Sequence, residues 1–131
     1  MNKTIYSFKF FFVPSERPWF KNLPKKSVAE AQGQSAVLHC RAAGDPKPEL
    51  KWRKDGVPLE SSKRIIFHSK KEILFLKQLR REDSGLYQCL AWNIVGNVTS
   101  TTNINVFGMF YQVLYTQITD KIWVHWLIRM I

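Results

Sequence analysis

Hydrophobic and polar residues alternate with a period of two through the middle of the chain. Such segments recur about every 8 to 12 residues between clusters of Gly, Pro, Asp and Ser, which is typical of an all-β sandwich or barrel. We therefore expect at least seven strands between about Val28 and Val106.

The alternation also predicts which side chains point inward, because successive residues of a strand face opposite sides of the sheet. In ELKWRKDG the indole of Trp52 lies inside, while Lys51 and Arg53 face outward. In RIIFHSKKEILFLKQL the second of two strands turns its leucines inward. The expected core positions are Cys40, Trp52, Leu74, Leu76, Leu79, Tyr87 and Cys89.

Three apolar residues, Ile66, Ile73 and Phe75, are expected on the outer face of neighbouring strands, where polar residues are usual. Clustered there, they mark a contact surface. The alternatives are that the ends of the chain cover them, or that the register differs by one residue and turns them inward.

The chain has a formal net charge of +10 over its 131 residues. Residues 25–106 hold 14 Lys and Arg against 8 Asp and Glu. Such a surface could bind heparan sulfate or an acidic protein, although solvated charge is the ordinary state of a protein surface. Nucleic acid is not expected, since no recognition helix or aromatic stacking platform accompanies the charge.

Catalysis is not expected from this sequence. His39, His68 and His125 are scattered, and the chain has no nucleophile elbow, Gly-rich phosphate loop or cluster of metal ligands. We therefore predict no enzyme activity, cofactor or metal. The two cysteines fit either one disulfide in an extracellular domain or two buried thiols in an intracellular one.

The two ends differ from the middle. Residues 1–18 lack a convincing signal peptide, and the apolar tail 108–131 is interrupted before it reaches the ~18 residues of a membrane-spanning helix. We expect both segments to lie outside a domain at 19–107, as in a fragment of a larger multi-domain protein. Sequons for N-linked glycosylation occur at Asn2 and Asn97, and Asn97 lies at an accessible hairpin.

Several spacings together resemble the immunoglobulin superfamily, in particular its intermediate set. Trp52 follows Cys40 by twelve residues, and GDPKPELKW and CLAWNIVG match the family's G-x-P-x-P…W and C-x-A-x-N-x-x-G segments. The family's pattern around its E and F strands is matched by Leu74, Leu76, Leu79, Asp83, Gly85, Tyr87 and Cys89.

The resemblance implies a Greek-key β-sandwich of two antiparallel sheets. It implies an inter-sheet disulfide between Cys40 and Cys89 that packs on Trp52. Tyr87 would be the tyrosine corner, its hydroxyl bonded to the backbone a few residues upstream. Arg64 and Asp83 would form a salt bridge.

The resemblance also implies a non-catalytic protein recognition module of a cell-surface or secreted protein, as in adhesion molecules and receptors. Its partner would be a protein ligand or a second immunoglobulin domain. Lys51 and Arg53 are further candidate contact residues, and so is Trp92 near the last hairpin, because aromatic residues carry much of the binding energy of interfaces. The alternatives are an intracellular spacer of a muscle-type filament protein and a heparan-sulfate-binding domain of a secreted growth factor.

Overall fold

The computed structural model describes residues 15–108, which form ten strands and one short 3₁₀ helix. The strands are β1 (Glu16–Asn22), β2 (Ser27–Ala31), β3 (Ala36–His39), β4 (Arg41–Asp45), β5 (Glu49–Lys54), β6 (Val57–Pro58), β7 (Ile65–His68), β8 (Ile73–Leu76), β9 (Gly85–Trp92) and β10 (Asn97–Phe107). The 3₁₀ helix η1 (Arg81–Asp83) lies between β8 and β9.

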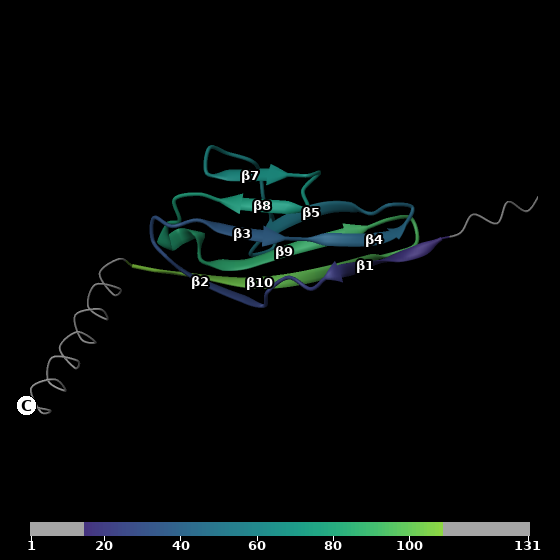
Figure 1. Cartoon of the computed structure of the whole chain (residues 1–131), viewed down its shortest axis with the longest axis horizontal. Coiled ribbons are helices and arrows are strands. Elements are labelled where there is room, and N and C mark those ends of the chain that lie inside the picture. Colours follow the sequence, from purple (N-terminus) through teal and green to yellow (C-terminus); the bar gives the residue numbers. More distant parts are fainter. Residues whose placement is uncertain (1–14, 109–131) are drawn as a thin grey trace, which may run out of the picture.

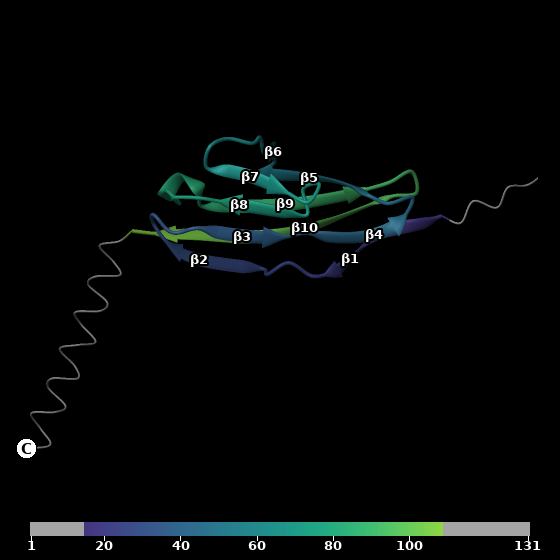
Figure 2. The same cartoon turned by 45° about the horizontal axis from the view of Figure 1, so that its top comes forward.

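The strands pack as a two-layer sandwich (Figures 1 and 2). One layer is a five-stranded sheet in the order β2-β10-β9-β5-β6. The other layer holds the three-stranded sheet β3-β8-β7 and the pair β1-β4, and β4 continues the chain from β3. The predicted immunoglobulin-like sandwich is thereby confirmed.

One strand pair departs from the expected antiparallel arrangement, because β2 runs parallel to β10. Pro24 lies between β1 and β2 and has no backbone N–H to continue a ladder. β1, before Pro24, pairs with β4 in one layer, and β2, after Pro24, pairs with β10 in the other. The N-terminal segment therefore contributes an edge strand to each layer.

The start of the domain and the continuity of one strand also differ from the sequence-based expectation. β1 begins at Glu16, three residues before the expected domain start, because Glu16 already pairs with Asp45 of β4 and Pro18 is buried. The predicted strand through Cys40 is interrupted at that residue, whose N–H donates to the Glu72 carbonyl oxygen at 2.7 Å. The interruption separates β3 from β4.

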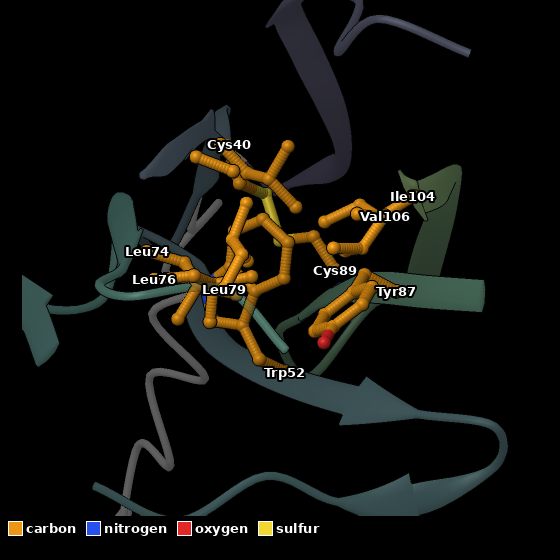
Figure 3. Packing of buried hydrophobic residues seen from close by; sticks show 11 residues of the cluster. Cys40, Trp52, Leu74, Leu76, Leu79, Tyr87, Cys89, Ile104 and Val106 are labelled. Atoms are coloured by element: carbon orange, nitrogen blue, oxygen red, sulfur yellow. A yellow bond between two sulfur atoms is a disulfide. The ribbon is translucent and has the colours of Figure 1, made fainter. Parts of the chain in front are cut away.

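The core lies between the layers and surrounds one disulfide (Figure 3). Cys40 and Cys89 are bonded across the layers with their Cα atoms 6.4 Å apart. Closing a loop of about 50 residues stabilises the fold by ~4 kcal/mol in the chain-entropy description. The Trp52 indole is 2% exposed beside the bridge, and its Nε1–H donates to the Lys71 carbonyl oxygen at 2.8 Å.

Candidate binding surfaces

A polar cluster around Asp83 closes the end of the core at η1. The Arg64 guanidinium donates to Asp83 Oδ2 at 2.7 Å and to Oδ1 at 3.2 Å, and the Arg80 backbone N–H donates to Oδ2 at 2.7 Å. The buried Tyr87 hydroxyl donates to the Asp83 carbonyl oxygen at 2.6 Å, four residues upstream. Every polar group of Asp83 is therefore used in structure.

The electrostatics of this cluster agree with a structural role. Burial raises the pKa of the Asp83 carboxyl, but the hydrogen bonds from Arg64 and the Arg80 backbone outweigh it and leave that pKa lowered. The hydrogen bond with Asp83 raises the pKa of Arg64. Burial raises the pKa of Tyr87 as well. Each group is held in its ordinary charge state, which is not the arrangement of an acid–base catalyst.

The outer face of β3-β8-β7 carries an apolar row. Phe75 of β8 pairs with Val37 of β3 on one side and with Ile66 of β7 on the other. Residues directly opposite each other share a face of the sheet. The row therefore lies opposite to the buried Leu74 and Leu76, with Val37 44% exposed and the other two half-buried.

A second row runs beside the first and is bounded by imidazoles. Ile73 pairs with His39 on β3 and with His68 on β7, and both histidines are exposed. The Lys77 ammonium lies 5.7 Å from the centre of the Phe75 ring. We name the four apolar residues Val37, Ile66, Ile73 and Phe75 the apolar strip.

The outer face of the five-stranded sheet carries a different surface. Lys51 of β5 pairs with Leu90 of β9, which pairs with Thr99 of β10. Two pairs further along β9 and β10, Trp92 and Asn97 pair on the same face. A shallow groove of about 670 Å³ runs over these residues, bordered by Arg53 and the hairpin Asn93–Gly96. We name it the aromatic groove.

Two contacts order the aromatic groove. The Lys51 ammonium lies 5.8 Å from the centre of the Trp92 ring, a cation–π distance. Asn93 Oδ1 accepts the N–H groups of Val95 and Gly96 at 2.9 and 3.2 Å, while its Nδ2 donates to the Glu16 and Pro46 carbonyl oxygens. The β9–β10 hairpin is thereby tied to two neighbouring segments.

The basic residues are divided among separate places. Lys51 and Arg53 border the aromatic groove, whereas Lys47, Lys70 and Lys71 line a hollow of about 390 Å³ on another side of the domain. That hollow also contains Glu49 and Glu72, and Glu72 lies 3.8 Å from the Arg41 guanidinium. Its charge is therefore mixed.

The described residues do not bring together the groups that metal binding needs. Across 15–108 no three His, Cys, Asp or Glu side chains converge on one point. No helix within that range is long and apolar enough to cross a membrane. His125, Asn2 and the tails 1–14 and 109–131 lie outside the described residues.

The sequence-based site predictions fall on three regions of the structure. The buried core contains Cys40, Cys89, Trp52, Leu74, Leu76 and Leu79. One outer face contains Ile66, Ile73 and Phe75. The other outer face contains Lys51, Arg53, Trp92 and Asn97. Sequence reasoning missed Val37, Leu90 and Thr99 as members of these faces. Their alternation places them outward, but only the strand pairing shows what lies beside them.

Comparison with known proteins identifies the class. The family model "Immunoglobulin I-set domain" matches residues 18–106, and the chain belongs to this family. Domains of this family are generally non-enzymatic, and they mediate contacts between proteins.

The chain is similar to a receptor, an adhesion molecule and a domain of titin. The chain is 38% identical over 74 residues to vascular endothelial growth factor receptor 1 of Gallus gallus, covering 56% of this chain and 6% of that protein. It is 37% identical over 104 residues to neural cell adhesion molecule L1-like protein of Mus musculus, covering 79% of this chain and 8% of that protein. The crystal structure of the titin M3 domain is 33% identical, has a TM-score of 0.63, and covers 70% of this chain and 97% of that one. The chain thus spans less than a tenth of these two curated relatives.

Proposed function

We propose that this chain is a non-catalytic recognition module of a cell-surface or secreted protein, and that it binds a protein ligand or a second immunoglobulin domain through the apolar strip. The observation that carries the proposal is the row of Val37, Phe75 and Ile66 across three strands. A solvent-facing sheet surface is ordinarily polar, and contiguous apolar side chains with a polar rim are typical of protein contact surfaces.

The disulfide supports the extracellular part of the proposal. A bridge such as Cys40–Cys89 persists in oxidising compartments and is rare in the cytosol. The receptor and the adhesion molecule among the relatives are consistent with it.

The strip offers a partner both area and geometry. Its two rows come from the centre and both sides of a three-stranded sheet, so the backbone beneath them is already ordered and loses little entropy on binding. Val37 projects furthest into solvent at 44% exposure, whereas Ile66, Ile73 and Phe75 form the half-buried floor. The imidazoles of His39 and His68 and the Lys77 ammonium supply polar groups at the edge.

A matched pair of variants tests the proposal. Val37 is 44% exposed on the strip, and Leu86 is 47% exposed on β9 in the other layer. The full chain is secreted behind a cleavable leader as wild type, Val37→Glu and Leu86→Glu, and its disulfide is verified by intact mass with and without reduction. Self-association is measured by sedimentation, and binding is measured on cells that display single receptor and adhesion ectodomains.

Val37→Glu is expected to weaken the interaction tenfold or more, because it buries a charge in an apolar contact at a cost of at least ~1.4 kcal/mol. Leu86→Glu is expected to bind as the wild type does. Equal binding of both variants contradicts the proposed surface. The two substitutions introduce the same charge at similar exposure, so a general effect of charge affects both.

Two alternative functions have tests of their own. The likeness to titin M3 favours an intracellular mechanical spacer, in which the cysteines stay reduced. Free thiols in protein isolated from its native cells would favour that function. Heparan-sulfate binding through Lys51 and Arg53 or through Lys70 and Lys71 would appear as an affinity that falls steeply with salt.

A further inference from the structure

Asn97 and Trp92 lie directly opposite each other where β9 and β10 leave their hairpin. Side chains at such positions point to the same face, with Cβ atoms about 5 Å apart. Asn97 is exposed and begins the sequon Asn97-Val98-Thr99, and Thr99 is exposed on the same face two pairs further along. The acceptor amide and the threonine hydroxyl therefore both face solvent at the rim of the aromatic groove.

The groove leads away from Asn97 along the strands. Successive outward residues of one strand are about 7 Å apart, which is close to the length of one or two sugar rings. Trp92 comes first and Leu90 second, and both belong to the lining of the groove. Together they form an apolar floor about as long as one or two sugar rings.

Polar groups border this floor. Lys51 lies above Trp92, and Asn93 and Thr99 belong to the lining. A sugar has C–H groups on the faces of its ring and hydroxyls around its edge, so it matches a floor of indole and leucine with donors at the rim.

We infer that Asn97 carries an N-linked glycan whose first sugars lie in the aromatic groove against Trp92. The inference rests on the proposed extracellular function, because N-linked glycans are added to secreted proteins. An attached sugar has a very high effective concentration at this groove, since Asn97 and Trp92 are adjacent in the ladder. The groove is then closed to a protein partner, and partner contacts fall to the apolar strip in the opposite layer.

Substitutions of Thr99 provide the test, since Ser preserves the sequon and Ala removes it without changing Asn97. The full chain is secreted behind a leader as wild type, Thr99→Ser and Thr99→Ala. Peptide mapping before and after enzymatic deglycosylation locates sugar at Asn97 independently of Asn2. Hydroxyl-radical oxidation of Trp92 is then followed by mass spectrometry, with Trp19, 47% exposed in the other layer, as the internal reference.

The expected result is occupancy of Asn97 in wild type and Thr99→Ser, with Trp92 oxidised several-fold more slowly than in Thr99→Ala. Trp19 should be oxidised equally in all three proteins. Trimming the glycan to its first N-acetylglucosamine should keep most of the protection, because that sugar lies nearest to Trp92.

Two results would overturn the inference. One is an unmodified Asn97 in secreted, disulfide-bonded chain. The other is equal oxidation of Trp92 with and without sugar, which would place the glycan away from the groove and leave that face open to a protein. Neither result bears on the Val37→Glu experiment. The opposite combination is also distinguishable. If the glycan protects Trp92 but Val37→Glu binds as the wild type does, the proposed contact surface is wrong and the inference about the glycan stands.

Discussion

Arg64 and Asp83 are joined by two hydrogen bonds, of 2.7 and 3.2 Å, although they lie 19 residues apart. Arg64 immediately precedes β7 in one layer, while Asp83 ends η1 and binds Tyr87 of β9 in the other. Asp83 therefore links both layers at the end of the sandwich opposite to the β9–β10 hairpin, through its carboxylate to Arg64 and through its backbone carbonyl oxygen to Tyr87.

Arg64→Ala is expected to lower the free energy of unfolding by about 3 kcal/mol, because Asp83 then stays buried without its ionic partner. Urea denaturation at neutral pH measures this loss. Arg80→Ala is the control, since the bond from Arg80 to Asp83 uses the backbone N–H and survives the substitution. Equal losses in both variants would contradict the role given to the ion pair.

The same pair predicts how stability depends on pH. The pKa of Asp83 is lowered in the fold, so its contribution is complete above the unfolded pKa of about 4 and is lost as pH falls through the folded value. The wild type should therefore lose stability on acidification below pH ~4. Arg64→Ala should lose less over that range, because its Asp83 no longer has the hydrogen bond that lowers the pKa.

Tyr87→Phe is expected to lower the free energy of unfolding by about 1 to 2 kcal/mol, because it removes the 2.6 Å hydrogen bond and leaves the Asp83 carbonyl oxygen without that donor.

Burial raises the pKa of Tyr87, so the contribution of Tyr87 to stability is complete below the ordinary tyrosine pKa of about 10 and falls as pH rises above it. In a spectrophotometric titration Tyr87 should ionise only when the fold opens. Its ionisation together with exposed tyrosines in folded protein would contradict this.

The predictable part of the molecule is the part that local alternation determines. Leu74 and Leu76 are inward and Phe75 is outward because strand geometry alone assigns their faces. The neighbours of Phe75 depend instead on which strands pair and in which register. Val37 is 38 residues away in sequence, and only the β3–β8 register places it beside Phe75.

The aromatic groove was less predictable for the same reason. Lys51, Trp92 and Asn97 were each identified from the sequence, but as separate candidates for a protein contact and for glycosylation. The β5-β9-β10 register places them on one face, where a glycan and a protein partner would compete for the same area. Hydrophobic patterning also does not predict left-handed backbone conformations, such as those at Gly85 and in the turn between β7 and β8.

Gly85 has a φ of +153°, and a Cβ at this residue would lie 2.6 Å from Asp55 Oδ2. Asp55 Oδ1 accepts the Leu86 N–H at 2.9 Å, so the carboxylate cannot move away without losing that bond. Gly85→Ala should therefore cost about 2 to 3 kcal/mol in thermal or urea unfolding. Gly33→Ala is the control, because Gly33 also has a positive φ of +87° but open space around it. Its cost should be only about 1 kcal/mol.

The turn between β7 and β8 holds two lysines in a conformation that favours other residues. Lys70 and Lys71 have φ values of +53° and +71°, and the Glu72 N–H donates to the Ser69 carbonyl oxygen at 3.1 Å. Ser69 before them also has a positive φ, of +50°. The positive φ values of Lys70 and Lys71 are those of the central positions of a type I′ turn, which prefer Asn and Gly because side chains strain the left-handed region. The combined variant Lys70→Asn, Lys71→Gly should gain about 1 kcal/mol of unfolding free energy.

The gain should persist at high salt, because it comes from the backbone and not from reduced charge repulsion. The Trp52 bond to Lys71 should also persist, since it uses a carbonyl oxygen that glycine retains. Lys63→Gly is the matched control, because Lys63 is exposed and has no positive φ, so glycine there should lower stability through the freer unfolded chain. A loss of stability in the turn variant at every salt concentration would show that the lysine side chains themselves stabilise the fold at this turn.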